Sequence, residues 1–95
     1  GEVVDRLFEL ARMFGEKLAA SGDFELALPP EGNIVCFRHT TADNRALRRR
    51  AVEDGRFYIV GTELDGRYHL RTTIMNPLTE ALDLDDLIEH LRCLA

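Results

Sequence analysis

Apolar residues recur every three or four positions in three segments of the chain, which predicts three amphipathic helices. The first runs from Val3 to Ala20, the second from about Asn44 to Asp54, and the third begins near Asp83. Asp83, Asp85 and Asp86 would lie at the positive N-terminal end of the third helix. The expected caps are Asp43 before the second helix, with Gly22 and Gly55 after the first and second helices.

Four segments between these helices have the alternating or β-branched pattern of strands. They are Phe24–Leu28, Asn33–Arg38, Phe57–Leu64 and Arg67–Met75. Asp65-Gly66 is typical of a two-residue hairpin turn, and Asn76-Pro77 ends the last strand. The order α-β-β-α-β-β-α predicts an α+β fold, a four-stranded, largely antiparallel sheet with three helices on one face.

The last strand has one apolar and one polar face, because strand side chains alternate. The apolar side carries Tyr68, Leu70, Thr72 and Ile74, and the polar side carries Arg67, His69, Arg71 and Thr73. Three helices are enough to cover one face of the sheet, so we expect the polar side to be uncovered. Such a face is either solvated or covers something anionic.

Length and composition predict a single domain over residues 1–95 with an ordinary core, since 45% of the residues are hydrophobic. The net charge of −5 speaks against nucleic-acid binding. No apolar run reaches the roughly 20 residues that span a bilayer, and no secretory leader is present. We expect the two cysteines, Cys36 and Cys93, to be buried free thiols, as is usual for a cytoplasmic protein.

The residues of a self-contained catalytic centre are missing from the sequence. The histidines have no ligand spacing with the cysteines, and no glycine-rich phosphate loop is present. Lys17, the only lysine, is on the polar face of the first helix, where we expect it to be solvated. Asp85 and Asp86 are explained by the helix dipole. We therefore predict no catalytic residue and no metal ligand in this chain.

Arg71 is the best candidate for a binding residue. A mid-strand arginine holds its guanidinium on a rigid element, which suits two-point recognition of a carboxylate or phosphate. The alternative is an ion pair across the hairpin with a carboxylate such as Glu63. His69 is either a solvated strand residue or a second group at the same anionic site. Asn33 and Arg38 are expected to make turn or edge hydrogen bonds.

Three segments taken in order resemble a known family: Asn33–Arg38, Glu53–Arg56 and Leu70–Thr79. They are similar to the C-terminal small domain of group II pyridoxal-phosphate-dependent amino-acid decarboxylases, which act on aromatic amino acids, glutamate or diaminobutyrate. Asp85–Ile88 resembles the closing helix of that domain. The resemblance implies a four-stranded antiparallel sheet whose inner face closes over the large pyridoxal-phosphate-binding domain of the same chain, within a homodimer.

The resemblance also implies a role for Arg71, which occupies the position of an arginine that contacts the substrate α-carboxylate. The family's catalytic lysine, aspartate and histidine lie upstream and are absent here, so the chain would be the C-terminal domain of a larger decarboxylase, not catalytic alone. Pyridoxal 5'-phosphate would bind in that larger protein. The alternative is a free-standing α+β binding or interaction module that senses an amino acid or other small anion through Arg71 and His69. An apolar surface beside Arg71, with Phe37, Val60 and Met75, would favour the docked domain.

Overall fold

The computed structural model of the chain describes residues 1–55, 59–74 and 78–95. The elements are α1 (Glu2–Ala20), β1 (Phe24–Leu26), β2 (Ile34–His39), α2 (Asn44–Asp54), β3 (Ile59–Leu64), β4 (Arg67–Thr73) and α3 (Ala81–Leu94). The predicted α+β order is confirmed. The predictions for Phe57, Met75 and the Asn76-Pro77 strand end lie outside the described residues.

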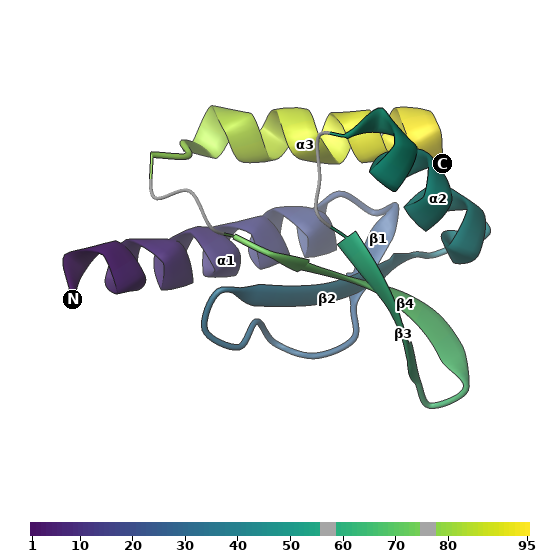
Figure 1. The fold of residues 1–95 in the computed structure, drawn as a ribbon, viewed down its shortest axis with the longest axis horizontal. Helices are drawn as coiled ribbons and strands as arrows, with labels where there is room; N and C mark the ends of the chain where they lie inside the picture. Colours follow the sequence, from purple (N-terminus) through teal and green to yellow (C-terminus); the bar gives the residue numbers. More distant parts are fainter. Residues whose placement is uncertain (56–58, 75–77) are drawn as a thin grey trace.

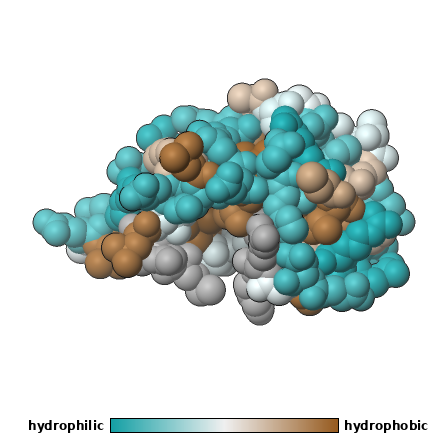
Figure 2. Space-filling view, turned by 90° about the horizontal axis from the view of Figure 1, so that it is seen from above, coloured by the Kyte–Doolittle hydropathy of each residue, from teal (hydrophilic) through white to brown (hydrophobic). Residues whose placement is uncertain are grey.

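The sheet is antiparallel throughout and has the strand order β1-β2-β4-β3. The three helices lie on one side of it, as predicted, with α3 running alongside α1 (Figure 1). α1 packs on β1 and β2, and α2 packs on β3 and β4. Seen from the helix side, the surface is mostly hydrophilic with scattered apolar groups (Figure 2). Among the described residues, no helix is long and apolar enough to cross a membrane.

The core lies between the helices and the sheet, and Phe37 is at its centre. The Phe37 ring makes edge contacts with Phe14 at 6.0 Å and with Phe24 at 5.9 Å between ring centroids. Phe37 is fully buried, so the expectation that it lies on the uncovered face was wrong. The nearly continuous apolar run of β2 concealed its alternation, in which Val35 and Phe37 face the helices and Cys36 faces away.

The helix ends follow the predicted capping chemistry, with one shift. The Asp43 side chain accepts hydrogen bonds from the backbone N–H groups of Arg45 and Ala46, and Gly55 ends α2 with φ 79°. α3 begins at Ala81, earlier than predicted, because Glu80 and Asp83 form a reciprocal capping box.

Lys17 was expected to be solvated and Asp85 was explained by the helix dipole alone, and the structure adds a contact between them. The Lys17 ammonium lies 2.8 Å from the Asp85 carboxylate. The ion pair connects α1 to α3, so Asp85 has a specific partner in addition to its place near the start of α3.

The β3–β4 hairpin positions the site. Asp65 and Gly66 have φ of 53° and 76°, the left-handed pair that a tight two-residue turn requires.

β1 is shorter than predicted. The Ala27 N–H donates to the Cys36 carbonyl at 3.0 Å, and beyond this hydrogen bond the chain leaves the sheet. Pro29 and Pro30 cannot donate to a strand ladder, which explains the early end of β1.

Candidate functional site

The sheet surface opposite the helices is termed the open face. Its side chains come from alternate positions of all four strands, with the segment after β1 beside them. As predicted, Arg67, His69, Arg71 and Thr73 lie on this face, and Leu70 is buried on the helix side. The other members are Glu25, Ile34, Cys36, Arg38, Val60, Thr62 and Leu64.

Arg71 is exposed on β4, a central strand, where it is opposite Cys36 of β2 and Val60 of β3. In the described part of the chain, no carboxylate forms an ion pair with its guanidinium. The expected pair with Glu63 was wrong. Glu63 is opposite Tyr68, on the helix side, where it pairs with Arg45 at 2.8 Å.

A small pocket adjoins Arg71, with a volume of about 180 Å³. Its walls are mainly apolar, and the residues that line it are Leu28, Pro29, Glu31, Ile34, Cys36, Thr62, Leu64 and Arg71.

Burial raises the pKa of the Cys36 thiol, and the positive charge of Arg71 opposes this rise. Cys93, in contrast, is exposed, so the prediction of two buried thiols holds for Cys36 only.

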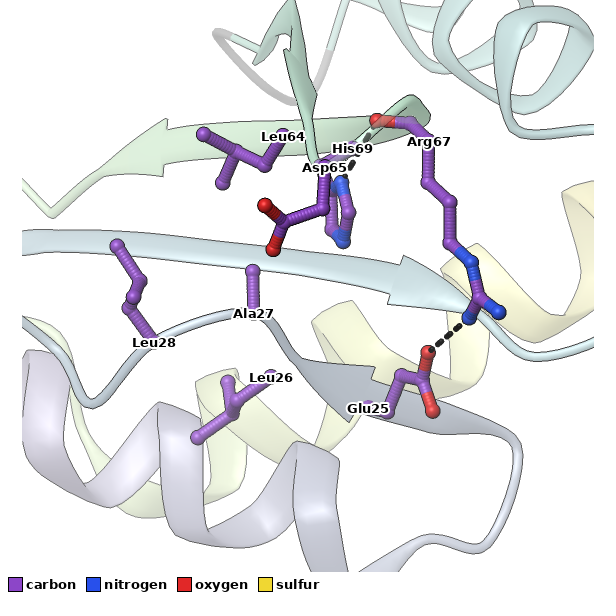
Figure 3. A pocket seen from close by; sticks show the side chains of 8 residues that line it. All are labelled: Glu25, Leu26, Ala27, Leu28, Leu64, Asp65, Arg67 and His69. Carbon is purple, nitrogen blue, oxygen red and sulfur yellow. Dashed lines mark hydrogen bonds and ion pairs between the residues drawn. The ribbon is translucent and has the colours of Figure 1, made fainter.

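His69 is only 6% exposed, which contradicts the interpretation of a solvated strand residue. Its Nδ1 lies 3.0 Å from the backbone oxygen of Arg67. The ring lines an open pocket of about 670 Å³ at the hairpin end of the sheet (Figure 3). His69 and Arg71 are about 7 Å apart along the strand. They therefore line neighbouring pockets, which share Leu28 and Leu64.

Glu25 and Arg38 are cross-strand partners at the rim of this pocket. Arg38 Nη1 donates to Glu25 Oε1 at 2.8 Å, and Arg67 Nη1 lies 3.9 Å from the same oxygen. The hydrogen bond from Arg38 is the main reason why the pKa of Glu25 is lowered. Arg38 thus makes the edge contact predicted for it. Asn33 also makes a structural bond, donating from Nδ2 to the Ile74 carbonyl at 2.9 Å.

Sequence reasoning missed Glu25, Leu28 and Asp65 as residues of the open face. Glu25 was detectable only through the strand register, which pairs it with Arg38. Leu28 was assigned to a strand, although it belongs to the segment that leaves the sheet and lines both pockets. Asp65 was interpreted as a turn residue only.

Comparison with known proteins shows which proteins are similar to this chain in sequence. The chain is 30% identical over 84 residues to an aromatic-L-amino-acid decarboxylase of Drosophila melanogaster, covering 86% of the chain and 16% of that protein. It is 33% identical over 85 residues to the 3,4-dihydroxyphenylacetaldehyde synthase of the same organism, with the same two coverages. No protein-family model matches the chain.

Solved structures show the same similarity to decarboxylases. The glutamate decarboxylase domain of a Vibrio parahaemolyticus diaminobutyrate-pyruvate transaminase and L-2,4-diaminobutyrate decarboxylase superposes with a TM-score of 0.88. It is 31% identical, and the match covers 99% of this chain and 22% of that one. This chain is related in sequence and fold to the C-terminal segment of group II pyridoxal-phosphate-dependent decarboxylases. It spans about one-sixth of the length of the curated decarboxylases that it matches.

Another solved relative, the tryptophan decarboxylase of Catharanthus roseus in complex with L-tryptophan, is 25% identical and has a TM-score of 0.82. This match covers 98% of the chain and 22% of the plant enzyme. The similarity to decarboxylases thus extends over nearly the whole of the fold described above.

The related decarboxylases use pyridoxal phosphate, and the residues of this chain do not by themselves fit that cofactor. A Schiff base requires a lysine in a pocket that lowers its pKa. Lys17 is the only lysine, and it is paired with Asp85 in the helix layer instead of facing the open face. Among the described residues, no group of three or more histidine, cysteine or acidic side chains could hold a metal ion.

Proposed function

We propose that this chain, over residues 1–95, is the C-terminal domain of a larger pyridoxal-phosphate-dependent amino-acid decarboxylase. Its open face closes the active site, and Arg71 anchors the substrate carboxylate. The larger protein, a homodimer, supplies the cofactor and the catalytic lysine. The observation that carries this proposal is the position of Arg71, a guanidinium without an ion pair to the described residues on the face that the helices leave uncovered.

The position of Arg71 suits carboxylate recognition. β4 is hydrogen-bonded to β2 on one side and to β3 on the other, so the arginine backbone is held on both edges. A planar guanidinium can bind a carboxylate through two parallel hydrogen bonds, which fixes orientation as well as position. Decarboxylation depends on the orientation of the bond that breaks, so an anchor of this kind would act mainly by positioning.

The surface around Arg71 supports a docked domain more than a free-standing module. Leu28 is 51% exposed and Ile34 is 37% exposed, and both line the small pocket beside Arg71. Partly buried Leu64 adds to the same apolar surface. A module that works alone in water would have a more uniformly polar face here, whereas an apolar surface around one cation is typical of a face that another domain covers.

The first test is the size of the native protein in its source cells, detected with an antibody raised against this domain. A band several-fold heavier than 10.8 kDa is expected for a domain of a decarboxylase. A native band at 10.8 kDa would overturn the proposal in favour of the free-standing module that senses an amino acid or other small anion.

The second test is Arg71→Ala in the larger protein. We expect kcat/KM for the amino-acid substrate to fall by about 100-fold, with Arg71→Lys intermediate, because a point charge replaces a two-point contact. Arg49→Ala is the matched control, since Arg49 is exposed on α2. Cofactor absorbance should be unchanged in all three variants. Equal kinetics for the Arg71 and Arg49 variants would refute the role of Arg71.

A further inference from the structure

We propose that His69 and Asp65 form a second binding point on the open face, which receives the basic head group of an arginine or lysine side chain. This side chain belongs to the protein segment that docks on the open face. The inference rests on the docking part of the proposed function, but it uses residues other than Arg71 and a different pocket.

His69 supplies a hydrogen-bond acceptor. Because the Arg67 carbonyl can only accept, the 3.0 Å contact places a proton on His69 Nδ1. The neutral ring then carries a lone pair at Nε2. Nε2 has no hydrogen-bond partner in the described structure, and the residue as a whole is only 6% exposed. The ring faces the pocket, so an N–H group that docks there can bond Nε2 in place of water.

The groups beside Asp65 in this pocket favour a basic donor. Two arginines share Glu25, with Arg38 at 2.8 Å and Arg67 at 3.9 Å from the same carboxylate oxygen. Asp65 has no ion-pair partner among the residues that the structure describes. Figure 3 shows the Asp65 carboxylate and the His69 ring directed into the same pocket, with Arg67 turned toward Glu25. The two acceptors that neither arginine pairs with are therefore one carboxylate and one lone pair, and both can accept from a basic donor.

The remaining walls suit the stem of a basic side chain. Leu26, Ala27, Leu28 and Leu64 line the pocket beside the polar groups. Arginine and lysine bury their methylene stems along such apolar surface while the charged head reaches polar partners. The pocket volume of about 670 Å³ leaves room for one such side chain and its flanking backbone. The two ends of the open face thus differ, with Arg71 suited to an anion and the His69–Asp65 pocket to a cation.

The test is a titration of the isotope-labelled 95-residue chain with acetyl-Gly-Arg-Gly-amide, followed by the nitrogen resonances of the His69 ring. The matched probe is the same peptide with citrulline, which keeps the shape of arginine and lacks its charge. We expect a saturable shift at Nε2 and at least about tenfold tighter binding of the arginine peptide. Equal binding of the two peptides, or no shift at Nε2, would overturn the proposal.

Variants locate the site. Asp65→Asn removes the charge and keeps a residue that tolerates the left-handed turn, so it should weaken the arginine peptide about tenfold without disturbing the hairpin. His69→Phe should abolish binding. The control Asp86→Asn alters an exposed carboxylate of α3 and should have no effect. Unchanged affinity in Asp65→Asn would also overturn the proposal, even if His69→Phe failed to fold.

The peptide titration and the Arg71→Ala test can fail independently of each other. If the peptide fails to bind while Arg71→Ala damages substrate use in the larger protein, only the second binding point is refuted. If the peptide binds as expected while Arg71→Ala behaves like its control, the role of Arg71 is refuted and the His69–Asp65 pocket stands.

Discussion

Arg71 on β4 lies directly opposite Cys36 on β2, and both side chains belong to the open face. The guanidinium and the thiol therefore share one small pocket and act on each other electrostatically. Burial disfavours the thiolate, and the arginine charge favours it. Burial is the larger effect, so the pKa of the Cys36 thiol lies above its usual value.

This balance predicts the reactivity of the two cysteines. In the native chain, Cys93 should react with a thiol-specific disulfide reagent much faster than Cys36, because Cys93 is exposed and Cys36 is buried. Arg71→Gln should slow Cys36 further, since removing the positive charge raises the thiol pKa again. Cys93→Ser isolates the Cys36 rate, and Arg49→Gln is the control. A faster Cys36 in Arg71→Gln would contradict the electrostatic account.

The Glu25–Arg38 pair predicts a dependence of stability on pH. The pKa of Glu25 is lowered in the folded chain, so the pair stabilises the fold above the ordinary glutamate pKa. This contribution should disappear as the pH falls through the lowered folded value. The measurement is the difference in unfolding free energy between the native chain and Glu25→Gln, at neutral and at acid pH. Arg38→Gln should raise the Glu25 pKa in an NMR titration, and an unchanged value would refute the assigned cause.

Gly61 and Tyr68 predict a coupled pair of substitutions. A methyl group at Gly61 would overlap the Tyr68 ring and hydroxyl across the hairpin. Gly61→Ala alone should therefore destabilise the chain by about 1–3 kcal/mol, as overpacking does. In a Tyr68→Ala background the same substitution should cost much less. A denaturant double-mutant cycle measures the coupling, and additive effects would show that the ring does not restrict this position.

Phe37 is expected to be the most sensitive residue of the sheet. Phe37→Ala removes a fully buried ring that contacts two other aromatic rings, so it should destabilise the fold by about 3–5 kcal/mol. Phe8→Ala is the matched control, because Phe8 is 46% exposed, and it should cost about 1 kcal/mol or less. Comparable losses for the two variants would contradict the assigned core.

The fold was predictable because local signals agreed with one another. The stop at Gly55, the cap at Asp43 and the hairpin at Asp65-Gly66 are all formed by residues whose backbone preferences favour them. The start of α3 was misplaced because Glu80, which caps it, is a less common capping residue than Asp83. The face of Phe37 was misassigned because an apolar run has no visible alternation.

The site was less predictable, because it depends on which strands become neighbours. The alternation of β4 was enough to place Arg67, His69 and Arg71 on one face. It could not show that the segment after β1 passes beside them and lines both pockets, or that His69 is buried. Nor could it show that Glu63 falls on the opposite face, where Arg45 of α2 is its partner.

The two central strands of the sheet come from different halves of the chain. Residues 1–43 contain α1, β1 and β2, while β4 follows α2 and β3 in the remainder. The central strand of each half has one neighbour within that half, β1 for β2 and β3 for β4, and its second neighbour in the other half. The shared core holds residues of both halves, including Phe14, Phe37, Leu70 and Leu84. A break in the segment between β2 and α2 would therefore separate two pieces that each have a central strand with one unpaired edge and an exposed apolar layer. Such pieces would be stable only together, which makes this domain suited to reassembly from two separately produced fragments.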